Sequence, residues 1–227
     1  MAREAFEREL TRLQKEIINL GDMVEKAIKD SIICLKNQDL DASRRLMAND
    51  NYINQKRYAI ETDTLVAIAT QQPMAGDLRI LAAILEIATE LERMGDYAKG
   101  IAKIALLIGD QPLIKPLIDI PRMADIACDM LHQSLEAFVL RNIELAKVIP
   151  QKDDEVDALY DQVNRELLTY IIADTKTIEQ ANYLLWAAHN LERTADRVTN
   201  ICERVIFTVT GEIAEMDSED SGLESID

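Results

Sequence analysis

The string Leu-Glu-Arg-x-x-Asp occurs twice in the chain, at residues 91–96 and again at residues 191–196. Residues four apart share one face of a helix, so Glu92 and Asp96 point the same way, as do Glu192 and Asp196. Carboxylates held side by side repel each other, and the repulsion grows at the rim of a protein core, where solvent screens it less. Each pair therefore needs protons, arginines or a metal cation nearby.

Two further pairs of oxygen-bearing side chains have the same spacing, one in each half of the chain. If the helices that carry them pack antiparallel at matching height, each half gathers four oxygen ligands. Oxygen ligands suit hard cations such as Mg²⁺, Ca²⁺, Mn²⁺ and iron, whereas a tight zinc site usually includes His or Cys. The predicted first metal site comprises Asp50, Asn54, Glu92 and Asp96, and the predicted second site comprises Asp153, Asp157, Glu192 and Asp196.

A simpler interpretation is an acidic, solvated helix face whose charges pair with Arg93 and Arg193. His189 precedes Glu192 by three residues and can reach the edge of the second cluster, although a lone histidine is more often a surface or core residue. The pattern Glu-x-x-x-Asp is common on any acidic helix. Its duplication at equivalent places is the part that favours a metal site.

The elements that position these residues are helices, because the chain is 48% hydrophobic but only 4% aromatic, with seven glycines and five prolines. Apolar residues recur every three or four positions, which is typical of amphipathic helices. Breaks fall at residues 37–41 and 71–77, and in the proline-containing segment 109–121. The predicted helices are 6–35, 39–69, 77–108, 121–140, 143–172 and 177–209.

The third and sixth predicted helices match each other at an offset of 100 residues without a gap. Seven positions are identical, among them the glutamate, arginine and aspartate of the repeated string. The second and fifth helices correspond at an offset of 103, which aligns Asp50 with Asp153 and Asn54 with Asp157. The sequence therefore predicts an all-α fold of two tandem, similar three-helix bundles, at residues 1–112 and 113–211.

The net charge of −16 argues against a nucleic-acid partner. Residues 212–227 include seven acidic residues and no Lys or Arg, and we expect them to form a disordered tail. The three cysteines are far apart, which favours reduced thiols.

The sequence shows no signal peptide and no membrane-spanning stretch, so we expect a cytoplasmic protein. No phosphate-binding glycine loop and no Cys–His or Ser–His arrangement is legible in the sequence.

The chain resembles the PhoU family of phosphate-signalling regulators. The resemblance rests on QQPMAGDLR at 71–79, LERMGDYAKGIA at 91–102, LERTADRVTNI at 191–201 and the Asp-x-x-Ile-Asn string at 50–54, and it extends over residues 1 to about 210. It implies two similar three-helix bundles whose acidic motifs bind metal ions. Asn54 stands in place of an acid, and Lys103 lies on the first cluster's side of its helix where its counterpart is Glu203. Both differences predict a stronger second site.

The resemblance also implies a regulator, not an enzyme. Such a protein represses the phosphate-starvation response and restrains phosphate uptake by contacting a Pst-type phosphate ABC transporter and, in many bacteria, a PhoR-type sensor kinase. It is expected to be a cytoplasmic homodimer that meets the membrane only through its partners. The alternatives are a metal-free helical interaction module and a carboxylate-bridged metalloenzyme. Asp77 is expected to cap a helix, and Arg79 to be a surface charge or a partner-binding residue.

Overall fold

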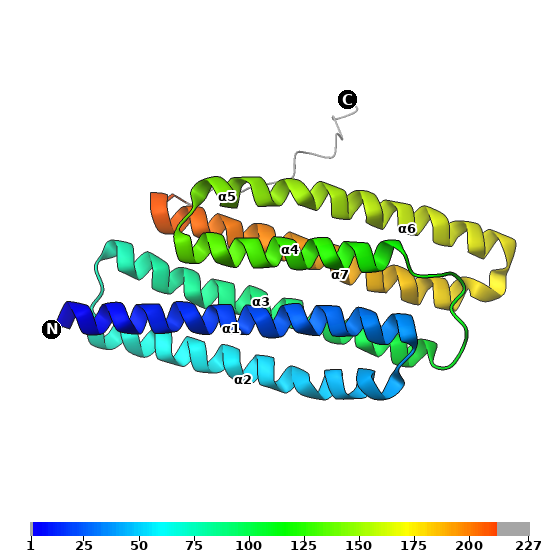
Figure 1. The fold of residues 1–227 in the computed structure, drawn as a ribbon, viewed down its shortest axis with the longest axis horizontal. Helices are drawn as coiled ribbons and strands as arrows, with labels where there is room; N and C mark the ends of the chain where they lie inside the picture. Colours follow the sequence, from blue (N-terminus) through cyan, green and yellow to red (C-terminus); the bar gives the residue numbers. More distant parts are fainter. Residues whose placement is uncertain (1, 213–227) are drawn as a thin grey trace, which may run out of the picture.

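The computed structural model describes residues 2–212, and within that range the chain is helical with no strand. The predicted all-α fold with six long helices is confirmed (Figure 1). Of the predicted acidic tail, residues 213–227 lie outside the described residues. The helices are α1 (Ala2–Asn37), α2 (Leu40–Gln71), α3 (Ala75–Ile108), α4 (Asp119–Leu140), α5 (Ile143–Val148), α6 (Asp153–Ala173) and α7 (Ile178–Thr210), with short 3₁₀ turns at Ile149–Lys152 and Thr175–Thr177.

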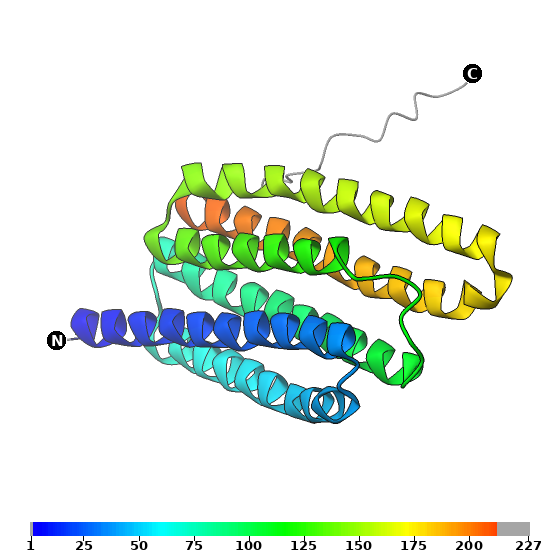
Figure 2. The ribbon, with the colours of Figure 1, turned by 45° about the vertical axis from the view of Figure 1, so that its right-hand side comes forward.

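The two halves of the chain form two bundles that lie against each other, as Figures 1 and 2 show from two directions. Helices α1, α2 and α3 form the first bundle, and α4, α7 and the α5–α6 pair form the second. Helices α3 and α7 make the most extensive contact of any pair of elements. The two helices that carry the repeated string therefore pack against each other at the centre of the molecule.

The structure corrects two local predictions. The helix predicted over 143–172 is interrupted by the 3₁₀ turn at Ile149–Lys152, because Pro150 has no amide hydrogen to continue the α-helical ladder. Helix α6 consequently begins at Asp153, so this acid lies in a first turn, where negative charge is favoured by the helix dipole. The predicted cap at Asp77 is wrong, because α3 begins at Ala75, two residues after Pro73, with Met74 at the cap position.

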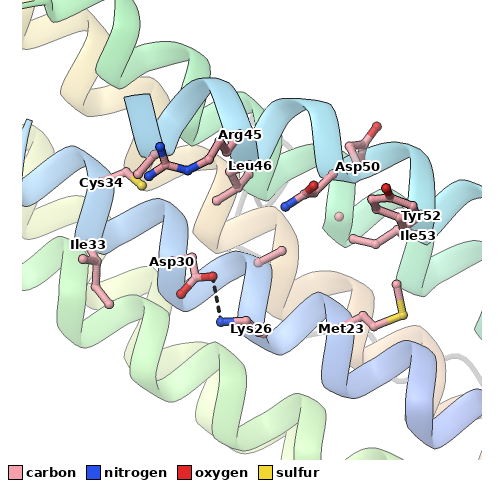
Figure 3. A pocket seen from close by; sticks show the side chains of 14 residues that line it. Met23, Lys26, Asp30, Ile33, Cys34, Arg45, Leu46, Asp50, Tyr52 and Ile53 are labelled. Atoms are coloured by element: carbon pink, nitrogen blue, oxygen red, sulfur yellow. Dashed lines mark ion pairs between the residues drawn. The ribbon is translucent and has the colours of Figure 1, made fainter. Parts of the chain in front are cut away.

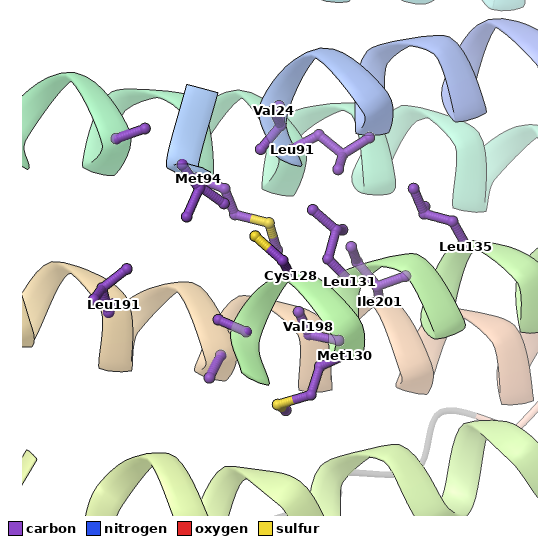
Figure 4. Close-up of a cluster of buried hydrophobic side chains, with 14 of the residues drawn as sticks. Val24, Leu91, Met94, Cys128, Met130, Leu131, Leu135, Leu191, Val198 and Ile201 are labelled. Atoms are coloured by element: carbon purple, nitrogen blue, oxygen red, sulfur yellow. The ribbon is translucent and has the colours of Figure 1, made fainter. Parts of the chain in front are cut away.

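One continuous hydrophobic core runs through both bundles. In Figure 4, Leu91 and Met94 of α3 face Cys128 and Leu131 of α4, with Val198 and Ile201 of α7 nearby; these six residues are all buried. Burial of this apolar surface is the main force that holds α3 and α7 together. It also fixes which faces of these helices are left for the acidic residues. None of the described helices is long and apolar enough to cross a bilayer.

Candidate metal centre

The eight predicted ligands lie on two pairs of adjacent helices. Asp50 and Asn54 are on α2, which packs against α3 with its Glu92 and Asp96. The equivalent four residues lie on α6 and α7, which also pack against each other. In each bundle, two neighbouring helices therefore bring their acidic faces together, as expected for antiparallel packing at matching height. We name these groups the first cluster (Asp50, Asn54, Glu92, Asp96) and the second cluster (Asp153, Asp157, Glu192, Asp196).

The solvent exposure of the acids in the second cluster increases from a buried base to an exposed rim. The side chain of Asp153 lies at the base, where only 8% of the residue is exposed. Glu192 is half-buried, whereas Asp157 and Asp196 are exposed. Among the described residues, the buried oxygen Asp153 Oδ1 has no hydrogen-bond partner, and neither has Thr199 Oγ1, three residues beyond Asp196. Buried polar atoms are almost always paired, so the unpaired oxygen of Asp153 leaves the second cluster able to accept a further donor or a cation.

Burial and mutual repulsion raise the pKa values of the second cluster. Burial is the larger cause at Asp153, and with the repulsion from Asp196, Asp157 and Glu192 it raises the pKa to about 7. The pKa of Asp157 and that of Glu192 are raised first by burial and then by the charge of Asp196. Burial also raises the pKa of Asp196, although the charges of nearby arginines oppose the rise. Each of these four carboxylates is therefore harder to ionise in the folded protein than in water.

His189 reaches this cluster, as its position three residues before Glu192 predicts. Its Nδ1 lies 3.1 Å from Glu192 Oε2, a distance that makes an ion pair only when the histidine is protonated. The His189 ring also lies against Tyr160, with 6.0 Å between the ring centroids. The histidine thus stands at the edge of the cluster on the same helix as Glu192.

The first cluster contains a cation of its own, which the sequence analysis missed. Lys99 Nζ lies 2.7 Å from Asp50 Oδ2 and 3.5 Å from Asp96 Oδ1. Asn54 Nδ2 donates to the same Asp50 oxygen at 3.2 Å. The hydrogen bond from Lys99 to Asp50 raises the pKa of the lysine. Lys103, which was expected on this face, is exposed and pairs with none of the four cluster residues.

Glu92 completes the first cluster without an ion-pair partner among the described residues. Burial and then the charge of Asp96 raise its pKa, while the charge of Arg57 lowers it. Arg57 itself pairs with Glu61 at 2.8 Å. Two cations, Lys99 and Arg57, therefore offset charge in and around the first cluster.

The repeated arginines form no ion pair with the cluster acids, although the charge of Arg93 lowers the pKa of Glu92 and that of Arg193 lowers the pKa of Asp196. Arg93 Nη1 lies 3.2 Å from Glu90 Oε1, and Arg193 stacks over the Tyr97 ring at 4.7 Å from its centroid. Within residues 2–212, no three Asp, Glu, His or Cys side chains converge as they would around a metal ion. The eight metal ligands therefore stay predictions. Of the two clusters, the second fits a cation better because the buried Asp153 Oδ1 has no partner among the described residues.

A cavity of about 540 Å³ lies beside the first cluster, between α1 and α2, and Asp50 forms part of its wall (Figure 3). Its polar side chains include Lys26 and Asp30, which pair with each other at 3.0 Å. Gly95 of α3 also lines it. A Cβ at Gly95 would come within 3.1 Å of Ile53 Cδ1, so the glycine allows α2 and α3 to approach closely here.

Arg79 lies against the end of α7. Its Nη1 is 2.8 Å from the place where a Cβ at Gly211 would stand, and Gly211 ends α7 with φ +80°. A positively charged guanidinium near the C-terminus of a helix interacts favourably with the negative end of the helix dipole. Arg79 therefore packs against the end of α7, and its predicted contact with a partner stays a prediction.

Comparison with known proteins identifies relatives over nearly the whole chain. The model of the PhoU domain matches residues 4–105 and 120–205, one match in each bundle. The phosphate-specific transport system accessory protein PhoU homolog of Aquifex aeolicus is 36% identical over 91% of this chain and 93% of its own length. The Escherichia coli accessory protein PhoU is 34% identical, with coverages of 91% and 86%.

Solved structures agree with this result. The crystal structure of the phosphate transport system regulatory protein PhoU from Streptococcus pneumoniae superposes with a TM-score of 0.86 at 31% identity, covering 93% of this chain and 100% of that one. PhoU from Pseudomonas aeruginosa superposes with a TM-score of 0.85 at 30% identity, covering 91% of this chain and 100% of that one. These relatives are named as accessory or regulatory proteins and not as enzymes.

Proposed function

The chain belongs to the PhoU family, and from this premise we propose that it is a metal-binding regulator of phosphate transport. It represses the phosphate-starvation response and restrains phosphate uptake by contacting a phosphate ABC transporter, a sensor histidine kinase, or both. It acts in the cytoplasm as a homodimer and meets the membrane through these partners. The observation that carries the regulatory part is the match of PhoU relatives across both bundles.

The metal-binding part rests on the second cluster. Asp153, Asp157, Glu192 and Asp196 would hold a hard cation such as iron, Mn²⁺, Mg²⁺ or Ca²⁺ through oxygen ligands alone. When bound, the cation supplies positive charge that relieves the repulsion among these acids. The chain's part is to keep Asp153 buried at the base and Asp157 and Asp196 at an open rim. That rim is where a cation could enter or meet an outside ligand.

A metal-free helical interaction module is the second candidate, and the first cluster favours it. There Lys99 already compensates the acidic charge, so duplication of an acidic string does not by itself require metal. In that case the regulatory function depends on protein contacts alone. The carboxylate-bridged metalloenzyme is set aside because the relatives are named as accessory and regulatory proteins.

The test of the regulatory function is genetic. Deletion of the gene should raise the expression of a phosphate-starvation reporter in phosphate-rich medium, and wild-type protein should restore repression. Complementation with Glu192→Ala/Asp196→Ala then separates the two candidates. Loss of repression by this variant, at normal protein level, supports a role for the cluster. Full repression supports the metal-free module, and a reporter that ignores the deletion contradicts the regulatory proposal.

A further inference from the structure

The two clusters differ at the position that follows the repeated string by three residues. Lys99 stands there in α3, and at the offset of 100 its counterpart in α7 is Thr199. Lys99 Nζ contacts Asp50 Oδ2 at 2.7 Å and Asp96 Oδ1 at 3.5 Å, so the ammonium links α2 and α3 through their acids. Thr199 Oγ1, in contrast, is buried without a hydrogen-bond partner. The same place thus holds a positive charge in one bundle and an unpaired hydroxyl in the other.

Exchanges of arginine between the two clusters run in both directions. Arg197, whose charge with that of Arg193 lowers the pKa of Asp196, stands in the second bundle where the first has Tyr97. Arg57, whose charge acts on Glu92, has Tyr160 as its counterpart at the offset of 103. Tyr160 lies near Glu192 but brings no positive charge. Asn54 is replaced by Asp157 at the same offset. The first bundle therefore has three acids with a lysine bonded to two of them, whereas the second has four acids and no lysine in contact.

The buried acids show the consequence. In the first cluster, Asp50 is only 5% exposed, yet its Oδ2 accepts hydrogen bonds from both Lys99 and Asn54. In the second cluster, the equivalent Asp153 is 8% exposed, and its Oδ1 accepts none. An ammonium within 4 Å of two carboxylates offsets the charge that a divalent cation would otherwise meet, and it takes up the same lone pairs.

We propose that Lys99 is a built-in cation that closes the first cluster to metal, so that the chain has one metal site, in the second bundle. This inference builds on the proposed function, because it assigns the metal to one of the two clusters. It also makes the two bundles chemically unequal despite their shared fold. Removal of the lysine charge should convert the first cluster into a second site.

The test measures Mn²⁺ binding to the full chain by equilibrium dialysis and by the shift in melting temperature. Wild type should bind about one equivalent of Mn²⁺. The variant Asp196→Asn should lose this binding, and Asp96→Asn should bind nearly as much as wild type. Lys99→Thr, which copies the second bundle, should gain about one further equivalent that Asp96→Asn removes again. Lys99→Met keeps the aliphatic chain and should show the same gain if Lys99→Thr folds poorly. Lys103→Thr, an exposed lysine on the same helix, is the matched control and should gain nothing.

The outcomes separate this inference from the proposed function. Wild-type binding that Asp96→Asn abolishes would show that the first cluster binds metal despite Lys99, and it would overturn the inference. The absence of any gain in both Lys99 variants would overturn it as well, whatever the wild type binds. If wild type binds no Mn²⁺ while Lys99→Thr gains a site that depends on Asp96, the role of Lys99 stands and the proposed second site fails.

Discussion

Replacement of Asp153 by Asn should stabilise the metal-free protein above neutral pH. Burial and the neighbouring carboxylates raise the pKa of Asp153 from its ordinary 3.8 to about 7. At about 1.36 kcal/mol per pH unit, ionised Asp153 destabilises the fold by at most about 4 kcal/mol. Solvent at the rim screens part of this repulsion, and the helix dipole at the N-terminus of α6 stabilises the ionised carboxylate. We therefore expect Asp153→Asn to increase the free energy of unfolding by about 1–2 kcal/mol.

The dependence on pH has a definite direction. The unfolded chain releases the Asp153 proton near its ordinary pKa of 3.8, whereas the folded protein keeps it until about pH 7. The folded state therefore binds more protons between these values, and Asp153 makes folding less favourable as the pH rises through that window. The advantage of Asp153→Asn should grow from about pH 4 to about pH 7 and stay constant above it.

Urea unfolding, followed by far-ultraviolet circular dichroism with a chelator present, measures this difference at about pH 4.5 and about pH 8. Asp161→Asn is the matched control, because Asp161 lies on the same helix with its side chain 65% exposed and forms a 3.9 Å ion pair to Arg165. This control should change stability by less than about 0.5 kcal/mol. An Asp153→Asn variant that is less stable than wild type at pH 8 would refute the reasoning.

Three further predictions concern other parts of the structure. Gly211→Ala should destabilise the protein by about 1–2 kcal/mol in urea unfolding, because φ is +80° and the new Cβ meets Arg79; adding Arg79→Ala should recover only the steric part. Gly95→Ala should cost about 1–3 kcal/mol by overpacking against Ile53, and Ile53→Val, which removes the nearest carbon, should reduce that loss. Cys202 should resist thiol reagents at pH 8 in the native protein and react after unfolding, because burial raises its pKa to about 12; rapid native labelling would contradict this.

The repeated string is the feature from which the two similar helical bundles could be predicted. Its offset of 100 residues identified α3 and α7 as equivalent helices of two similar bundles, whereas their extensive contact with each other is seen only in the structure. The break at Pro150 was missed because apolar spacing continues through it, although a proline at the eighth residue of the predicted helix should have weighed against one continuous helix. Helix boundaries depend on local hydrogen bonds that a three-to-four periodicity does not report.

The candidate site was predicted in part. The sequence placed Asp153 and Glu192 in one cluster, but burial, which sets the pKa of Asp153, is a property of the packed helices. Lys99 was missed because its contact with Asp50 depends on the height at which α2 meets α3, and sequence spacing shows only that it lies three residues beyond Asp96. Comparison of the two repeats could have found it, since Thr199 stands at the equivalent position.

The central claim is that the second cluster is a metal site. The most direct test is elemental analysis of wild-type protein purified without chelator or an affinity metal, beside the variant Glu192→Ala/Asp196→Ala. We expect the wild type to carry about one equivalent or more of iron, manganese or another hard cation, and the variant to lose most of it. Equal metal content in the two proteins, or none in either, would contradict the claim.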